Sequence, residues 1–206
     1  SLEVIDGGYL ARLWSANTLT GVFAGSTPDP TAWNYNPDRR IGGMFFNAHG
    51  GSYDSFRYSS TVGAGVDLIK WNVDRPFVFT ENDFSWKNDV SVYHAMQIDK
   101  PTPNPSTPTV SAGLGQSFLS VQVHVLSRAT LELNDTYFRD IPTYDPELVG
   151  TGLLDQYLFQ GLTGGARIDF PMHITGYFSG GQSSTSTDTG KSWNLQGGVT
   201  MSHIRN

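Results

Sequence analysis

The sequence predicts an all-β protein with about eleven antiparallel strands in one domain over residues 1–206. Three observations support this fold class. Apolar and polar residues alternate with a period of two over several segments, which is typical of a strand with one apolar face. Short turns or proline-bearing loops separate these segments, as they do between neighbouring strands of an antiparallel sheet. No run of ten residues keeps a helical period.

The clearest pair of strands lies at residues 118–138. Apolar side chains occupy every second position from Leu119 to Val125, with serine, glutamine and histidine between them. After a tight connection at residues 126–128 the alternation resumes at Ala129, Leu131 and Leu133. The segment is therefore expected to be a β-hairpin with one apolar and one polar face.

The other strands follow the same criterion with varying clarity. In chain order they are expected at residues 9–14, 19–23, 41–48, 61–68, 77–86, 90–98, 157–167, 173–180 and 193–202. Apolar and polar residues alternate without interruption at 90–98 and 193–202. The inward face of 41–48 is unclear because Met44, Phe45 and Phe46 are adjacent. In 77–86 apolar residues occur at both odd and even positions, so its parity is mixed.

The connections between the expected strands differ in length in a regular way. They are short at 15–17, 88–89, 126–128 and 168–171, long at 26–39, 99–115, 139–154 and 181–191, and of six or seven residues at 49–55 and 69–75. From residue 76 onward short and long connections alternate, which places the long ones at one end of the sheet. Outer-membrane barrels have this arrangement, with tight turns inside and long loops outside.

The composition agrees with such a barrel. Only 16% of residues are charged and 38% are hydrophobic, whereas soluble domains carry about a quarter charged residues. No apolar run reaches the roughly 18–20 residues of a spanning helix, which excludes a helical membrane protein. The chain has no cysteine, which excludes disulfides, and its net charge of −6 argues against nucleic-acid binding.

These features give the chain a resemblance to Gram-negative outer-membrane β-barrel (porin-like) proteins. The alternating runs at 90–98, 119–133 and 193–202, the loop alternation and the aromatic residues near strand ends carry the resemblance. Those aromatic residues are Trp14, Trp86, Tyr137, Tyr157 and Trp193. The resemblance implies an antiparallel up-and-down transmembrane β-barrel in the outer membrane. Its partners would be membrane lipid and either other envelope proteins or the rest of a larger barrel.

The chain departs from the resemblance in two respects. Such proteins commonly end on an aromatic residue, whereas this chain ends with the residues His203 to Asn206. Eleven strands would also leave the two ends on opposite sides, whereas bacterial barrels have an even number of strands. Either residues 2–5 belong to an extra strand, or the chain is the C-terminal portion of a larger barrel, and we favour the second interpretation.

The sequence offers no constellation for catalysis. The five histidines are far apart and none has the spacing of a metal-binding motif. No G-x-S-x-G segment is present, which argues against a hydrolase nucleophile elbow. Glu81 and Asp83 share one parity and could form an acid–base pair, but a polar pore lining is the better interpretation. We expect no enzymatic activity, no cofactor and no metal.

Two groups of candidate binding residues remain. The candidates for lining a lumen are Asp67, Glu81, Asp83, Lys87, His124 and Glu132, and their acidic excess favours cations. The loop candidates are Trp33, Tyr35, Asp38, Arg39, Arg40, Asp140 and Asp145. The first five of these suit either sugar contact or packing between loops. The acidic segment at 139–154 has the oxygen ligands that Ca²⁺ prefers but lacks a calcium-loop motif.

The leading hypothesis is a passive pore or a transport or export component, with a polar lumen gated by the long outer loops. The alternative is a soluble secreted β-sandwich that binds carbohydrate or assembles on a cell surface. A barrel would turn Val199 outward, whereas a sandwich would bury Leu131 and Leu195 between two sheets.

Overall fold

The computed structural model describes residues 6–27, 36–100, 111–139, 158–171, 173–185 and 190–202. These residues form a single antiparallel sheet of eleven strands in sequence order, without a helix. The strands are β1 (Asp6–Ser15), β2 (Thr18–Ser26), β3 (Arg39–Gly51), β4 (Phe56–Ile69), β5 (Asn72–Trp86), β6 (Val90–Asp99), β7 (Gly113–Leu126), β8 (Ala129–Arg139), β9 (Leu158–Phe170), β10 (Ile174–Thr185) and β11 (Ser192–Met201). The all-β class and the strand number predicted from the sequence are thus confirmed.

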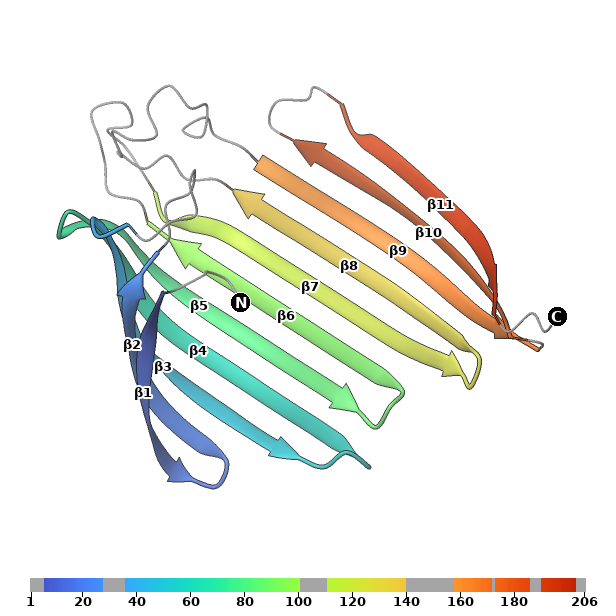
Figure 1. Cartoon of the computed structure of the whole chain (residues 1–206), viewed down its shortest axis with the longest axis horizontal. Helices are drawn as coiled ribbons and strands as arrows, with labels where there is room; N and C mark the ends of the chain where they lie inside the picture. The colour runs from blue at the N-terminus through green and yellow to red at the C-terminus, as the bar shows by residue number, and fades with distance from the viewer. Residues whose placement is uncertain are drawn as a thin grey trace.

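The sheet is open. β1 and β11 form its two edges, and β1 and β2 bend out of the plane of the central strands (Figure 1). Every strand pairs only with its neighbours in sequence, so the described residues form one layer. The two facing layers expected for the alternative β-sandwich are not found among them.

The apolar face of the sheet continues from strand to strand because the registers align apolar residues. One row across this face consists of Leu10, Val22, Met44, Ala64, Val78 and Ile98. A second row consists of Tyr58, Phe84, Val92, Val121, Leu133, Gly164, Gly180 and Leu195. Directly paired residues project to the same side of a sheet, so these rows share one surface.

The opposite face is polar across nearly its whole width. One row consists of His49, Ser59, Asp83, Tyr93, Ser120, Asn134, Thr163, Gly181 and Asn194. The sheet curls toward this polar face, because side chains from strands that are not neighbours meet there. The rings of Tyr9 on β1 and Phe45 on β3, for example, have centroids 6.4 Å apart.

Large rings on the polar face lie over glycines of adjacent strands. A Cβ atom on Gly21 or Gly65 would come within 2.5 Å of the ring of Phe45 or Phe77, respectively. Phenylalanine opposite glycine therefore fills the space that a second side chain would occupy. This pairing explains why the inward face of 41–48 is unclear from the sequence: Phe45 turns to the polar face while Met44 and Phe46 lie on the apolar face.

The connections confirm the predicted alternation and correct some of its boundaries. Residues 16–17, 52–55, 87–89, 127–128 and 171–173 join strands at one end, which we call the turn end. Residues 27–38, 70–71, 100–112, 140–157 and 186–191 join them at the other, which we call the loop end. The predicted connections at 49–55 and 69–75 are too long, because β3 and β5 extend into them. Likewise β10 extends to Thr185, so the polar tract from 181 is partly strand.

The connection at 70–71 is a two-residue turn in which both residues have positive φ, 50° for Lys70 and 66° for Trp71. This geometry matches the twist of a hairpin, although neither residue is the asparagine or glycine that favours it. Pro76, which suggested a break in the sequence, lies within β5 opposite Val66. The pairing of β4 with β5 shifts its register between Asp67 and Leu68, close to this proline. Such an irregularity allows β5 to remain paired here.

Candidate functional site

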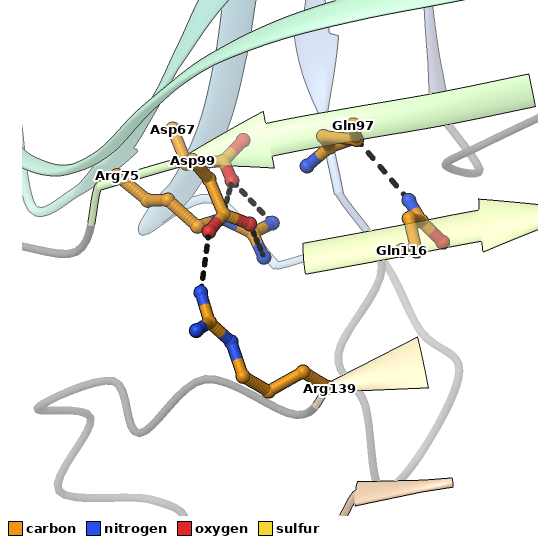
Figure 2. Close-up of polar contacts among 6 residues, drawn as sticks. All are labelled: Asp67, Arg75, Gln97, Asp99, Gln116 and Arg139. Carbon is orange, nitrogen blue, oxygen red and sulfur yellow. Dashed lines mark hydrogen bonds and ion pairs between the residues drawn. The ribbon is translucent and has the colours of Figure 1, made fainter. Parts of the chain in front are cut away.

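The polar face carries its most organised side chains at the loop end, where five strands contribute to one group of ion pairs and amides. This group, which we call the loop-end ladder, consists of Asp67, Arg75, Asp99, Arg139, Gln97 and Gln116 (Figure 2). β4, β5, β6, β7 and β8 each supply at least one member. The ladder therefore runs across the strands rather than along one of them.

Arg75 lies between the two aspartates of the ladder. Its Nε and Nη2 atoms donate to Oδ2 of Asp67 at 2.8 and 2.6 Å. Its Nη1 atom lies 3.9 Å from Oδ2 of Asp99. Hydrogen bonds between a guanidinium and a carboxylate are charge-assisted, and this pair is the strongest contact of the ladder.

Arg139 approaches Asp99 from β8, two strands away. Its Nη2 atom lies 3.5 Å from Oδ1 of Asp99. The contact crosses β7, where a Cβ atom on Gly113 would come within 2.9 Å of the Arg139 guanidinium. A side chain at Gly113 would require the guanidinium to shift, so the glycine leaves room for this contact.

The acidic members of the ladder are buried, and some polar atoms of the ladder have no hydrogen-bond partner in the described part of the chain. The side chain of Asp99 is 1% exposed and that of Asp67 is 10% exposed. Oδ1 of Asp67, Oδ2 of Asp99 and Nε of Arg139 have no hydrogen-bond partner among the described residues. Gln97 is also buried and accepts a hydrogen bond of 3.2 Å from Gln116. Burying charges is unfavourable unless they are paired, so each member depends on the others.

The position of the ladder relates it to two of the long connections. Asp99 is the last residue of β6 and precedes residues 100–112, and Arg139 is the last residue of β8 and precedes 140–157. Their contact joins the points at which both connections leave the sheet. In chemical terms the ladder can hold the ends of neighbouring strands together, because its charges are paired with one another. The described residues contain no group of His, Cys, Asp or Glu able to hold a metal ion.

Sequence reasoning found Asp67 but missed the other members of the ladder. The predicted connection at 69–75 includes Arg75, and the predicted long loops begin at Asp99 and Arg139, so the sequence does not indicate that these side chains lie on the sheet. The sequence contains one indication of Asp99. It lies at an odd-numbered position, as do Ser91, Tyr93 and Gln97, whose side chains are on the polar face.

The structure separates the predicted lumen residues into three groups. Asp67 belongs to the ladder. Glu81, Asp83 and Glu132 lie on the polar face of β5 and β8, and within the described part of the chain none of them forms an ion pair. Lys87 and His124 lie at the turn end, Lys87 in the connection 87–89 rather than on the strand face.

The predicted loop residues are described only in part. Trp33, Tyr35, Asp140 and Asp145 lie outside the described residues. Of the others, Asp38 has its Oδ2 atom 3.9 Å from Nζ of Lys70, and Nε of Arg39 donates to Oγ1 of Thr27 at 3.4 Å. Arg40 stacks on Trp71, with its guanidinium carbon 3.8 Å from the centre of the ring. Each of these three residues contacts another described residue at the loop end of the sheet.

Comparisons of this chain with protein-family models, with curated proteins and with solved structures found no match. Within the described ranges no helix has the length and apolar character needed to cross a membrane.

Proposed function

We propose that this chain forms all or part of a transmembrane β-barrel in a Gram-negative outer membrane and acts as a passive pore or as a transport or export component. The observation that carries the proposal is the exposure of the apolar face. Leu10 and Leu195 are each 76% exposed and Val199 is 74% exposed. Leu131, which a sandwich would bury, is 48% exposed.

The amount of buried apolar surface supports the same proposal. Among the described residues the only buried hydrophobic side chains are Ile41, Phe77 and Ala95. Burial of apolar surface is the main favourable term in the folding of a water-soluble domain. A sheet of this size with three such residues lacks that term in water, whereas contact of its apolar face with hydrocarbon would supply it.

Three polar side chains on the apolar face of β4 and β5 are compatible with hydrocarbon because they bond one another. Oγ of Ser60 donates to Oδ1 of Asn82 at 2.6 Å, and Nδ2 of Asn82 donates to Oγ1 of Thr80 at 3.0 Å. Polar groups in a bilayer must find partners within the protein.

The edges of the apolar face carry aromatic and cationic side chains, as a membrane interface requires. Arg12 stacks on Trp14 near the turn end, with its guanidinium carbon 4.3 Å from the ring centre. The Arg40–Trp71 stack lies at the loop end, so the two stacks flank the apolar face from opposite ends.

A pore of this kind requires the sheet to close. β1 and β11 are at the edges of the sheet, and exposed edges readily pair with another strand. We propose that they pair with each other or with strands of a larger assembly, so that the polar face lines the lumen. Glu81, Asp83 and Glu132 would then give the lumen a preference for cations.

The experiment that tests the proposal is refolding with and without detergent. The full chain should be β-rich and monodisperse only in detergent micelles or lipid vesicles, and should co-sediment with envelope membranes. A monodisperse, β-rich sample in plain buffer would overturn the proposal, because an apolar face of this extent cannot remain exposed to water.

A further inference from the structure

The turn end of the polar face contains an open hollow that is separate from the loop-end ladder. Three neighbouring connections surround it: residues 52–55, 87–89 and 127–128. Its lining includes Tyr53, Arg57, Lys87 and His124, together with small polar side chains such as Ser85 and Ser91. Arg57, Ser85 and Ser91 are directly paired across β4, β5 and β6 and so share the polar face.

Backbone hydrogen bonds join the connection 87–89 to the connection 52–55 on one side and to β7 on the other. The amide of Lys87 donates to the carbonyl of Ser55 at 2.6 Å, and the amide of His124 donates to the carbonyl of Asp89 at 2.7 Å. Lys87 also has a φ of 51°, which fixes the tight turn that it occupies. The walls of the hollow are therefore positioned by the sheet rather than by side-chain contacts alone.

The cations of the hollow are not neutralised by the protein. Arg57 stacks on Tyr53, with its guanidinium carbon 4.5 Å from the ring centre. Stacking occupies a face of the guanidinium and leaves its N–H groups available. In the described residues neither Arg57 nor Lys87 forms an ion pair, whereas Arg75, Arg139 and Arg167 all pair with aspartates.

The balance of charge in the hollow is therefore positive although the whole chain has a net charge of −6. Its described lining holds Arg57 and Lys87 against one carboxylate, that of Asp89. Ser85, Asn88 and Ser91 add hydroxyl and amide donors, and Val90, Val125 and Leu126 form an apolar part of the lining. Two cations with several neutral donors make a suitable environment for an anion that has several acceptor oxygens.

We propose that this hollow binds a phosphate group, with Arg57 as the planar donor and Lys87 as the second cation. A phosphate group can come from a free solute or from a lipid headgroup. Arg57, Ser85 and Ser91 project to the polar face, away from the surface that would meet lipid, which favours a free solute. This site does not depend on the proposed pore, because the described residues form it whether or not the sheet lies in a membrane.

The test is calorimetric titration of the refolded full chain, in a neutral detergent, with sodium phosphate against sodium chloride at equal ionic strength. Saturable binding of phosphate is expected. Arg57→Gln and Lys87→Gln should each weaken it by about tenfold or more, the loss expected for one charge-assisted hydrogen bond. A second titration with micelles that contain phosphatidic acid separates the two sources, and binding only there would overturn the assignment to a solute.

Matched control variants keep the test specific. Arg12→Gln removes an arginine that is also stacked on an aromatic ring, but on the apolar face. Lys191→Gln removes an exposed lysine outside the hollow. Both should bind phosphate like the unaltered chain. Equal weakening in the control and site variants, or no binding to the unaltered chain, would overturn the proposal. Lys87 is exposed in a turn, so its variant is expected to fold even if the Arg57 variant does not.

Discussion

Phe23 on β2 and Phe79 on β5 have ring centroids 6.2 Å apart, although two strands lie between them. The contact is possible because Gly43 on β3 and Gly63 on β4 lie beneath the rings. It shows that the first part of the sheet is strongly curved toward the polar face. The curvature therefore requires small residues at Gly43 and Gly63.

The first prediction concerns Gly43. A Cβ atom there would lie 2.6 Å from the Phe23 ring and 2.8 Å from the Cα atom of Gly65. Gly43→Ala should lower the free energy of unfolding by about 1–3 kcal/mol, the usual cost of overpacking. Urea unfolding of the refolded protein measures this. Gly42→Ala is the control, because its Cβ atom would meet only the Phe23 carbonyl oxygen at 3.6 Å. Equal effects of the two variants would contradict the role of Gly43.

The second prediction concerns the loop-end ladder. Arg75→Gln leaves the buried carboxylates of Asp67 and Asp99 without their shared cation. Removing one partner of a buried pair typically costs about 3–5 kcal/mol. Adding Asp67→Asn to Arg75→Gln should recover part of the loss, and thermal or urea unfolding of the two variants would show it.

An exposed ion pair provides the control for that prediction. Arg167 and Asp169 lie 3.4 Å apart with side chains 59% and 51% exposed. Arg167→Gln should have a much smaller effect than Arg75→Gln, because solvent screens an exposed pair. If Arg75→Gln were no more harmful than Arg167→Gln, the ladder would not stabilise the sheet.

The third prediction tests which face meets hydrocarbon. Val199→Arg places a charge on the apolar face, and in lipid vesicles it should cost about 2–4 kcal/mol if the residue sits near the bilayer midplane. Thr200→Arg, the next residue on the polar face, should cost little. Unfolding in vesicles would show the difference. Similar small costs for both variants would argue against contact of this face with lipid.

The fourth prediction concerns ion preference. The combined change Glu81→Gln and Asp83→Asn removes two carboxylates that have no cationic partner in the described part of the chain, so the cation preference of the pore should fall. The reversal potential across a planar bilayer under a salt gradient measures this preference. Asp169→Asn is the control, since Arg167 already compensates its charge. An unchanged reversal potential in the double variant would show that these residues do not line the conducting path.

The sequence alone predicted much of the architecture for a physical reason. A period of two identifies a strand and its faces together, so Val199 and Leu195 could be assigned to the apolar face before any coordinates were known. The apolar face of β4 and the positions of the long connections followed from the same pattern. Each of these features depends only on residues close together in the chain.

The features that were missed depend on register or on unusual backbone geometry. Phe45 lies on the polar face because Gly21 stands opposite it, and that pairing is known only once β2 and β3 are aligned. The turn at Lys70 and Trp71 contains no residue that favours positive φ. The contact of Asp99 with Arg139 joins strands separated by β7, which no local pattern indicates.

Pairing only between strands that are consecutive in sequence has a consequence for how the chain folds. Contacts between neighbours close short loops, and a low contact order favours fast folding. Each completed hairpin of this protein offers its free side to the strand that follows in the chain. The sheet is therefore expected to assemble in order, hairpin by hairpin, and the outer sides of β1 and β11 are where a strand from another polypeptide could continue it.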